Sequence, residues 1–293
     1  MFDSHGHLYE DRLAADLPRV VEHAQMDGMR GVLLAGETPS TWRAQAVLRA
    51  RFHSPTFCVG LAYGVHPVCA AAMSAQDLSH ALSALHRAVR GQPVSDSDLG
   101  SDLAGLPAPN AVGELGLDLR HPATRGTLPK QTRAFSAQLA LAREQNLPVV
   151  LHIVSAHADA LRLLKQEGLP AAGGVVHSFS GSAEVCREYL SLGLCMSFSG
   201  ALARSSAPKL ARAARTVPLD RLLVETDVPF QTPAQCRPAP GQTASAPFPW
   251  SAVLSAVLSA LSLARNEPIS VLSEHTERNA RALFRLPSAP QPV

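Results

Sequence analysis

Short apolar runs alternate with longer amphipathic stretches along most of the chain. The short runs predict eight strands, at residues 2–7, 31–35, 56–63, 111–117, 148–153, 173–178, 194–198 and 221–226. The Ala-, Leu- and Arg-rich stretches repeat with the helical period and predict helices at 11–28, 41–52, 75–90, 130–145, 156–167, 182–192, 206–215 and 251–264. Eight repeats of strand then helix predict an α/β fold, a closed (β/α)8 TIM barrel.

The length of the chain agrees with one barrel domain. Its 293 residues give about 37 residues for each strand–helix unit, which suits this fold. We expect a single domain over residues 1–286 and a disordered tail at 287–293. Two segments rich in turn-forming residues interrupt the pattern, an insertion at 91–110 and a Pro-rich loop at 232–249. The loop either shapes a substrate entrance over the C-terminal mouth of the barrel or is an irregular linker.

The composition is that of an ordinary globular protein. Hydrophobic residues make up 46% and charged residues 17% of the chain, and the formal net charge is +2. These values exclude disordered and fibrous classes, and they argue against nucleic-acid binding through bulk positive charge alone. Any contact with nucleic acid must therefore be local.

Cysteine usage and the N-terminus favour a cytoplasmic protein. The five cysteines include no Cys-x-x-Cys pair, so neither a disulfide framework nor a thiolate zinc site is indicated. The first residues lack the basic and apolar regions of a secretion signal, and no apolar stretch approaches the roughly 20 residues of a membrane-spanning helix. We expect no association with a membrane and see no sign of an obligate protein partner.

Histidines and carboxylates gather at the C-terminal ends of predicted strands, where barrel enzymes build their sites. The first strand ends in a His-x-His pair, whose two side chains point to the same side because side chains alternate along a strand. Five strands together contribute His5, His7, Glu114, His152, His177, Glu225 and Asp227.

A metal centre explains this gathering better than separate structural roles do. Each side chain alone could cap a backbone group, but so many at one rim would be mutually costly without cations to offset their charge. Six potential ligands exceed the need of one tetrahedral zinc ion and suit a metal pair bridged by a carboxylate. None of the three lysines lies on a predicted strand, so a carbamylated lysine cannot be the bridge, and Glu114 is the candidate.

The chain resembles the TatD family of metal-dependent deoxyribonucleases. The resemblance runs from the first residues to about residue 286, and its specificity comes from many short motifs in the right order. The motifs are His5-Gly-His7, Gly64-Val-His66-Pro67, Gly113-Glu-Leu-Gly-Leu-Asp118, Leu147-Pro-Val-Val-Leu-His152, Val176-His177-Ser-Phe-Ser-Gly181, Met196-Ser-Phe-Ser-Gly200, Leu223-Val-Glu-Thr-Asp-Val-Pro229 and Thr276-Glu-Arg-Asn-Ala280.

This resemblance implies a TIM barrel of the metal-dependent hydrolase type that cleaves DNA phosphodiester bonds with two divalent cations, such as Mg²⁺, Mn²⁺ or Zn²⁺. It implies that Glu114 bridges two ligand groups. His5, His7 and Asp227 complete one group, and His152 and His177 complete the other.

The resemblance also suggests catalytic roles. We expect Asp227 to be the general base, because it is both a ligand and the last carboxylate of its strand. Glu225, one layer deeper, would orient ligands. His66 either contacts the substrate phosphate or water, or caps a turn before Pro67. For Asp118 we expect a turn or helix-capping role.

Two departures from the family pattern affect substrate binding. Family members usually place a small residue and then an arginine after the histidine of the fifth strand, where this chain has Ile153 and Val154; Val68 also stands where a polar residue is common. Neither departure touches an expected ligand. We expect loop arginines near the mouth to replace the lost charge, with Arg120 and Arg204 the first candidates and Arg125 and Arg237 the others.

Other functions remain open at this point. The same metal site on this fold can hydrolyse a small amide, ester or phosphoester, and Ile153 and Val154 favour that alternative slightly. A weakly catalytic protein that binds nucleic acid or a partner is the other alternative, although a complete ligand set argues against it. RNA is a possible substrate beside DNA.

Overall fold

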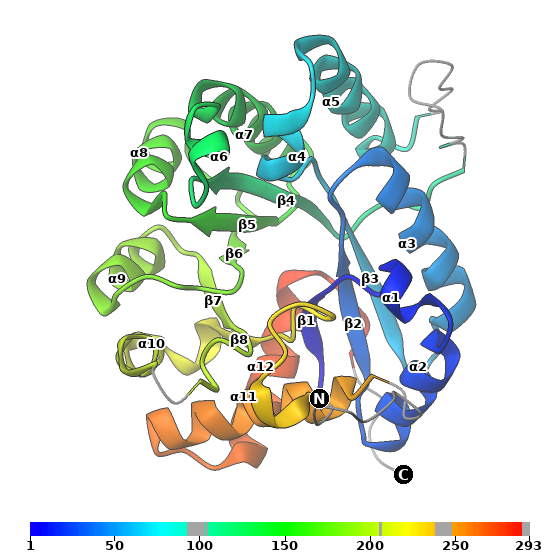
Figure 1. Ribbon diagram of the computed structural model, residues 1–293, viewed down its shortest axis with the longest axis vertical. Helices are drawn as coiled ribbons and strands as arrows, with labels where there is room; N and C mark the ends of the chain where they lie inside the picture. Colours follow the sequence, from blue (N-terminus) through cyan, green and yellow to red (C-terminus); the bar gives the residue numbers. More distant parts are fainter. Residues whose placement is uncertain (93–102, 104, 205–206, 238–247, 289–293) are drawn as a thin grey trace.

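The computed structural model describes residues 1–92, 103, 105–204, 207–237 and 248–288. Eight parallel strands form one sheet in chain order, enclosed by helices (Figure 1). The strands are β1 (Asp3–Gly6), β2 (Gly31–Ala35), β3 (Cys58–Tyr63), β4 (Ala111–Asp118), β5 (Val149–Val154), β6 (Gly174–Val176), β7 (Cys195–Phe198) and β8 (Leu222–Val224). The predicted (β/α)8 fold is confirmed.

The barrel closes between its first strand and the segment after its last strand. Gly6 forms an isolated parallel bridge with Val228. The Asp227 amide donates to the His5 carbonyl at 3.1 Å, and the His7 amide donates to the Val228 carbonyl at 2.8 Å. Closure therefore brings the His-x-His pair of β1 beside the carboxylates that follow β8.

The helices are α1 (Asp11–Ala14), α2 (Leu17–Met26), α3 (Pro39–Phe52), α4 (Pro67–Ala72), α5 (Ala75–Val89), α6 (Pro122–Arg125), α7 (Leu128–Glu144), α8 (His157–Glu167), α9 (Ala183–Ser191), α10 (Pro208–Thr216), α11 (Trp250–Arg265) and α12 (Ile269–Leu283), with 3₁₀ turns η1 (Leu219–Arg221) and η2 (Ala234–Cys236). In the part of the chain that the structure describes, none of them is long and apolar enough to cross a membrane.

The prediction of one helix over residues 11–28 is wrong, because the chain breaks it into α1 and α2. Pro18 lies in the first turn of α2 and has no N–H with which to continue a hydrogen-bonded helix from α1. The short helices α4 and α6 were also missed, since one or two turns give too little periodicity to detect.

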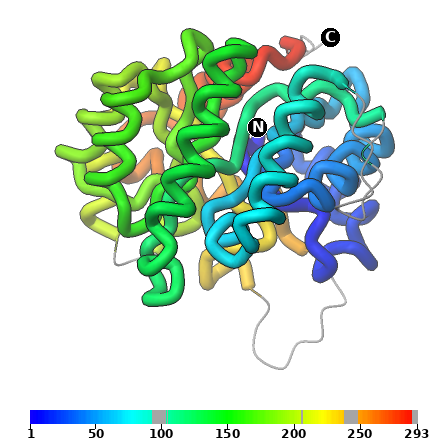
Figure 2. Tube along the Cα trace, turned by 90° about the horizontal axis from the view of Figure 1, so that it is seen from above, coloured from blue at the N-terminus to red at the C-terminus, as the bar shows by residue number. Residues whose placement is uncertain are grey.

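Segments that follow β1, β3 and β4 lie at one end of the molecule in Figure 2, opposite the red α12.

Alternation along the strands divides the buried apolar residues into two cores. The larger core lies between the outer faces of the strands and the helices. The smaller core takes residues from β2 to β8 together with Phe2 and with Ala280, Phe284 and Leu286 at the end of α12 and just beyond it. The chain after α11, for which we expected no helix, therefore supplies the apolar residues that close the N-terminal end of the barrel.

Three expected features fall largely outside the described residues. Of the insertion expected at 91–110, residues 93–102 and 104 are outside them, and so are residues 238–247 of the Pro-rich loop and 289–293 of the tail. The boundaries of a single domain at 1–286 stay a prediction.

Asp3 ties β1 to the segment after β8 and to α11. The fully buried Asp3 carboxylate accepts hydrogen bonds from the amides of His5 and Thr226, from the Thr226 hydroxyl at 2.5 Å and from the Trp250 indole at 2.7 Å. Burial raises the pKa of Asp3 to about 7, although all four hydrogen bonds lower it. Each donor therefore offsets part of the cost of burying a carboxylate at the point where the barrel closes.

Replacing Thr226 by Val tests this closure, because it removes the hydroxyl and keeps the shape. We expect Thr226→Val to lower the free energy of unfolding by about 1–3 kcal/mol, since Asp3 loses a buried donor. Urea unfolding in the presence of EDTA measures the change. The matched variant Thr56→Val, at an exposed position, should change it by less than about 0.5 kcal/mol. Equal unfolding midpoints for the two variants would contradict this role of Asp3.

Candidate metal centre

The structure brings together all six predicted metal ligands, which lie within their strands or just after them. His5 lies in β1 and His7 follows it, Glu114 lies in β4, His152 in β5, His177 follows β6 and Asp227 follows β8. Five of these side chains are buried, and His152 is partly exposed.

A bulge in β4 directs Glu114 into the centre. The pairing of β4 with β5 shifts between Gly113 and Leu115, so Glu114 leaves the regular ladder. Its amide donates instead to the Gly36 carbonyl at 2.9 Å. Gly64 allows this close approach, since a Cβ atom there would lie 2.4–2.7 Å from the backbone of Gly113 and Glu114.

The first donor set surrounds Oε1 of Glu114. The Nε2 atoms of His5 and His7 each lie 3.4 Å from Oε1 and 3.2 Å from one another. Oδ1 of Asp227 lies 3.2 Å from His7 Nε2 and 3.8 Å from His5 Nε2. His5 and His7 thus face one carboxylate oxygen of Glu114, and Asp227 faces the two histidines from the segment after β8.

The second donor set surrounds Oε2 of the same carboxylate. His177 Nε2 lies 3.0 Å from Oε2, His152 Nδ1 lies 3.4 Å from it, and these two nitrogens are 2.9 Å apart. His66 Nε2 lies 3.2 Å from His152 Nδ1 and 3.9 Å from Oε2. His66 also caps α4, because its Nδ1 accepts from the Val68 amide. Both of the roles considered for His66, at the site and at a turn, are therefore compatible with its position.

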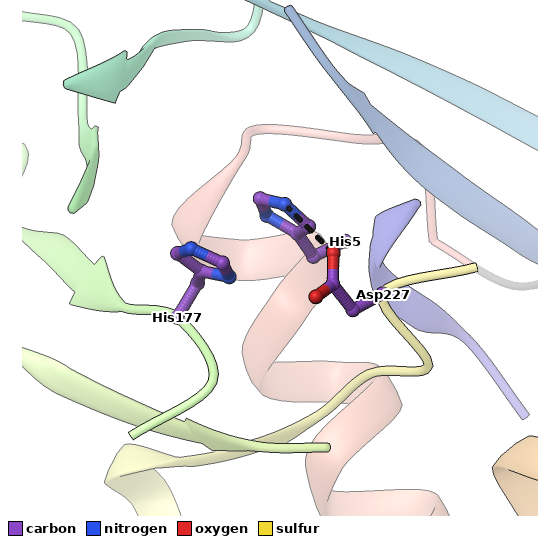
Figure 3. A group of neighbouring side chains, drawn as sticks. All are labelled: His5, His177 and Asp227. Atoms are coloured by element: carbon purple, nitrogen blue, oxygen red, sulfur yellow. Dashed lines mark ion pairs between the residues drawn. The ribbon is translucent and has the colours of Figure 1, made fainter. Parts of the chain in front are cut away.

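The two sets lie next to one another. His5 and His177 stack with ring centroids 4.0 Å apart and planes 8° apart, and Asp227 lies beside them (Figure 3). His5, His177 and Asp227 themselves form a group whose donor atoms lie within 4.8 Å of one another. The candidate centre is thus one continuous cluster of side chains with Glu114 in its middle.

These donors fit divalent cations. Nitrogen and oxygen ligands about 2.0–2.2 Å from an ion in tetrahedral geometry lie about 3.3–3.6 Å from one another, close to most distances within each set. Imidazole nitrogens that converge on a common point cannot all form hydrogen bonds with one another. Each nitrogen is either a donor or an acceptor, and a hydrogen bond needs one of each. Oε1 of Glu114 is buried and has no hydrogen-bond partner in the described part of the chain. A cation would supply the missing partner.

Carboxylates orient two of the histidines of the second set. Oδ2 of Asp118 lies 3.2 Å from His152 Nε2, which leaves Nδ1 directed at Glu114. Oε1 of the fully buried Glu225 lies 3.3 Å from His177 Nδ1, which leaves Nε2 for the centre. Asp118 also accepts from the Arg120 amide at 2.9 Å. The turn role expected for Asp118 is present, but its contact with His152 was not predicted.

Tyr9 orients His7 in the same way and was missed in the sequence. The Tyr9 hydroxyl lies 2.7 Å from His7 Nδ1 and donates to the Ala35 carbonyl at 2.9 Å, with Glu37 Oε2 at 3.2 Å. Tyr9 follows the His-x-His pair by two residues, which places it on the same side of the chain. This spacing was the one available signal.

Gln231 holds Asp227 and was also missed. Gln231 Nε2 donates to Asp227 Oδ2 at 2.8 Å and to the Ser178 hydroxyl at 2.6 Å, and its Oε1 accepts from Ser199 at 2.9 Å. Ser178 and Ser199 belong to the two Ser-Phe-Ser-Gly motifs, and their hydroxyls lie 2.9 Å apart. Asp227 therefore directs Oδ1 at the first donor set while Gln231 restrains Oδ2.

The histidines and carboxylates of this cluster stabilise one another's charged forms. Burial lowers the pKa of His7, but the hydrogen bond with Asp227 and the charges of Glu114, Asp227 and Glu37 outweigh it and raise this pKa to about 9. Burial also opposes the charged form of His177, yet Glu114 and Glu225 raise its pKa well above the ordinary range. In turn, histidine partners overcome burial and hold the pKa of Glu114 well below its usual range and that of Asp227 at about 2.

His66 differs from these histidines. Burial and the neighbouring His152 lower its pKa to about 3, and Glu114 opposes this only in part. Because Nδ1 accepts from the Val68 amide, the neutral ring carries its proton on Nε2, which can donate a hydrogen bond toward the centre.

The predicted substrate arginines are not equally close to the centre. Arg120 lies 3.4 Å from Asp118 Oδ2, the atom that faces His152. Arg204 is exposed in the segment after β7. Arg125 and Arg237 donate to the carbonyls of Leu119 and Thr232 on their own loops.

The two departures are also placed by the structure. Ile153 is 3% exposed, so its side chain packs in the core, and Val154 is partly buried. Val68 is 40% exposed at the start of α4. The end of β5 therefore offers no cation to a substrate.

Comparisons with known proteins bear out the resemblance. A family model described as TatD related DNase matches residues 2–285. The chain is 34% identical over 287 residues to the 3'-5' ssDNA/RNA exonuclease TatD of Edwardsiella piscicida, which covers 98% of this chain and 100% of that protein. It is 31% identical to a Bacillus subtilis protein named uncharacterized metal-dependent hydrolase YabD, over 98% of this chain and 99% of that one.

A solved structure agrees with the fold. The crystal structure of YJJV, a TatD homologue of Escherichia coli K12, superposes with a TM-score of 0.78, at 26% identity and over 98% of each chain.

Metal binding should release protons. At pH 7 the pKa shifts of His7 and His177 keep both rings protonated in the metal-free protein, and a ligand nitrogen must lose its proton. We expect Zn²⁺ binding at pH 7 to release about two protons, and the affinity to rise with pH at least as far as about 9, the pKa of His7. Calorimetric titration in two buffers of different ionisation enthalpy measures this number.

The variant His7→Asn is the control for this titration and should release about one proton fewer. Identical binding heats in the two buffers would mean that no net proton is released, and would contradict the charge state given above.

Proposed function

The chain belongs to the TatD-related DNase family, and from this membership and the geometry of its centre we propose that it is a two-metal nuclease acting on single-stranded DNA. The observation that carries the proposal is the division of the donors between the two oxygens of Glu114. Relatives are named as 3'-5' ssDNA/RNA exonucleases, so we expect cleavage from a 3′ end, with RNA as a second substrate.

Two divalent cations would bind on either side of Glu114. His5, His7 and Asp227 would hold one cation, and His152 and His177 would hold the other, with His66 close to the second. The many imidazole donors favour Zn²⁺ or Mn²⁺ over Mg²⁺, which prefers oxygen ligands. When bound, such cations lower the pKa of a water molecule and offset negative charge on a phosphate.

Asp227 is the general base of this proposal. Its low pKa, about 2, leaves the carboxylate unprotonated at neutral pH and able to take a proton from attacking water. Gln231 restrains Oδ2 and so fixes the direction in which the carboxylate faces. Glu225 and Asp118 hold the rings of His177 and His152 in the orientation that binding requires.

His66, Arg120 and Arg204 are the proposed substrate contacts. The neutral imidazole of His66 faces the second donor set and can donate to a phosphate oxygen or to water. The Arg120 side chain is 57% exposed beside Asp118, where it can reach a phosphate. Arg204 would contact the strand further from the centre.

A second candidate is a hydrolase of small amide, ester or phosphoester substrates. Its support is the apolar end of β5, where Ile153 and Val154 provide no positive charge for a polyanion. We also propose a cytoplasmic location, because all five cysteines are free, as suits a reducing compartment.

A gel assay separates these functions. Labelled single-stranded DNA and RNA are incubated with the protein and Mn²⁺, Zn²⁺ or Mg²⁺, or with EDTA. We expect metal-dependent shortening from the 3′ end, with the rate lowered about 10²- to 10⁴-fold by Asp227→Asn because the general base is lost. The exposed Asp220→Asn variant is the matched control and should cleave at the normal rate. Stoichiometric metal without cleavage of either strand would contradict the nuclease and favour the small-molecule hydrolase.

Charge reversal tests the arginines. We expect Arg120→Glu and Arg204→Glu each to weaken strand binding and to reduce the slope of log affinity against log salt by about 0.7–1, because each phosphate contact releases counterions. Fluorescence anisotropy at several salt concentrations measures both effects. Arg187→Glu on α9, where the arginine is 62% exposed, is the control. An affinity and a slope equal to those of the control would refute the assignment of either arginine.

A further inference from the structure

Phe230 is an exposed aromatic side chain beside the first donor set. Among the large hydrophobic side chains that are more than a third exposed in the described part of the chain, it is the one aromatic, at 37% exposure. It follows Asp227 by three residues, and its amide donates to the Asp227 carbonyl at 2.7 Å. This tight turn fixes the ring at a set distance from the centre.

Two contacts define how the ring lies. The rings of Phe230 and His7 meet edge to face, with centroids 5.4 Å apart and planes 77° apart. The guanidinium of Arg12 lies over the Phe230 ring, with Cζ 4.4 Å from the centroid. Arg12 belongs to α1, which follows β1, and is itself exposed. An aromatic ring and a planar cation thus lie together at the edge of the metal centre.

The core gives no reason for this arrangement. Exposing an aromatic ring forgoes the hydrophobic stabilisation that burial would provide, and Phe230 belongs to neither of the two cores. Its ring instead contacts His7, a histidine of the first donor set. Val68, two residues after His66, is a second exposed apolar side chain, at 40% exposure.

We propose that Phe230 and Arg12 form a platform on which a nucleobase next to the scissile phosphodiester bond stacks. Every base has a π-face, so aromatic rings and arginine planes bind single strands with little dependence on sequence. The exposed Arg12 guanidinium would also bring a positive charge near the adjoining phosphate. The platform rests on the proposed function, because it assigns a nucleic-acid strand to the same site.

A fluorescent base reports stacking directly. The probe is a single-stranded oligonucleotide with 2-aminopurine at its 3′-terminal nucleotide and phosphorothioate linkages that slow cleavage, mixed with the metal-loaded protein. Stacking on a ring quenches this base. We expect quenching by the wild type and by Phe230→Tyr, and its loss in Phe230→Leu, with affinity weakened about 5- to 150-fold.

Two controls separate stacking from a structural effect. Phe52 lies under Arg51 on α3, with Cζ 5.1 Å from its ring centroid, away from the strand ends that hold the donors, so Phe52→Leu should leave quenching and affinity unchanged. An oligonucleotide whose terminal nucleotide lacks its base should bind the wild type and Phe230→Leu equally. The wild type should bind this abasic strand about 5- to 150-fold more weakly than the normal strand. This comparison uses only the wild-type protein, so it does not depend on whether a variant folds.

Equal quenching and affinity in the wild type and Phe230→Leu would overturn the platform, as would equal affinity of the wild type for normal and abasic strands. Cleavage of the unmodified strand is measured in parallel. If the wild type cleaves it while either of these results is found, the platform fails and the nuclease stands. If the wild type cleaves no strand, the proposed function fails whatever the quenching shows.

Discussion

The centre depends on one buried carboxylate, that of Glu114, placed between two groups of histidines. A carboxylate with so little access to water is costly unless positive charge surrounds it. The fold meets this constraint by taking Glu114 out of the β4 ladder and by closing the barrel so that β1, β5, β6 and the segment after β8 bring their polar ends to it. Because Oε1 and Oε2 face different donor sets, the carboxylate would bridge the two cations of the proposed centre.

Much of this centre was predictable from the sequence. Histidines and carboxylates that end apolar runs are visible without a structure, and parallel strands must bring their C-terminal ends to one face. Alternation places His5 and His7 on one side, and the absence of a strand lysine left Glu114 as the bridge. The grouping of donors on each side of Glu114 came from the resemblance to a family, since spacing along the chain cannot assign a ligand to one cation or the other.

The residues that hold the ligands were harder to predict, because their roles arise from contacts between distant segments. Asp118 has the sequence context of a turn, and only the packing of β4 on β5 shows that it also faces His152. Gln231 and Arg12 belong to no motif. Gln231, in the segment after β8, contacts Asp227, and Arg12, in α1, contacts Phe230. Helix α12 was not predicted for a similar reason. Its role depends on the packing of Ala280 and Phe284 against residues from the strands, which are distant in the sequence.

The most direct test of this account is a crystal structure of the protein soaked in Mn²⁺, with anomalous scattering used to locate the ions. The account predicts two anomalous peaks, one on each side of the Glu114 carboxylate, the first among His5, His7 and Asp227 and the second beside His152 and His177. A single peak, or two peaks that both lie on one side of Glu114, would contradict the claim that this carboxylate bridges a metal pair.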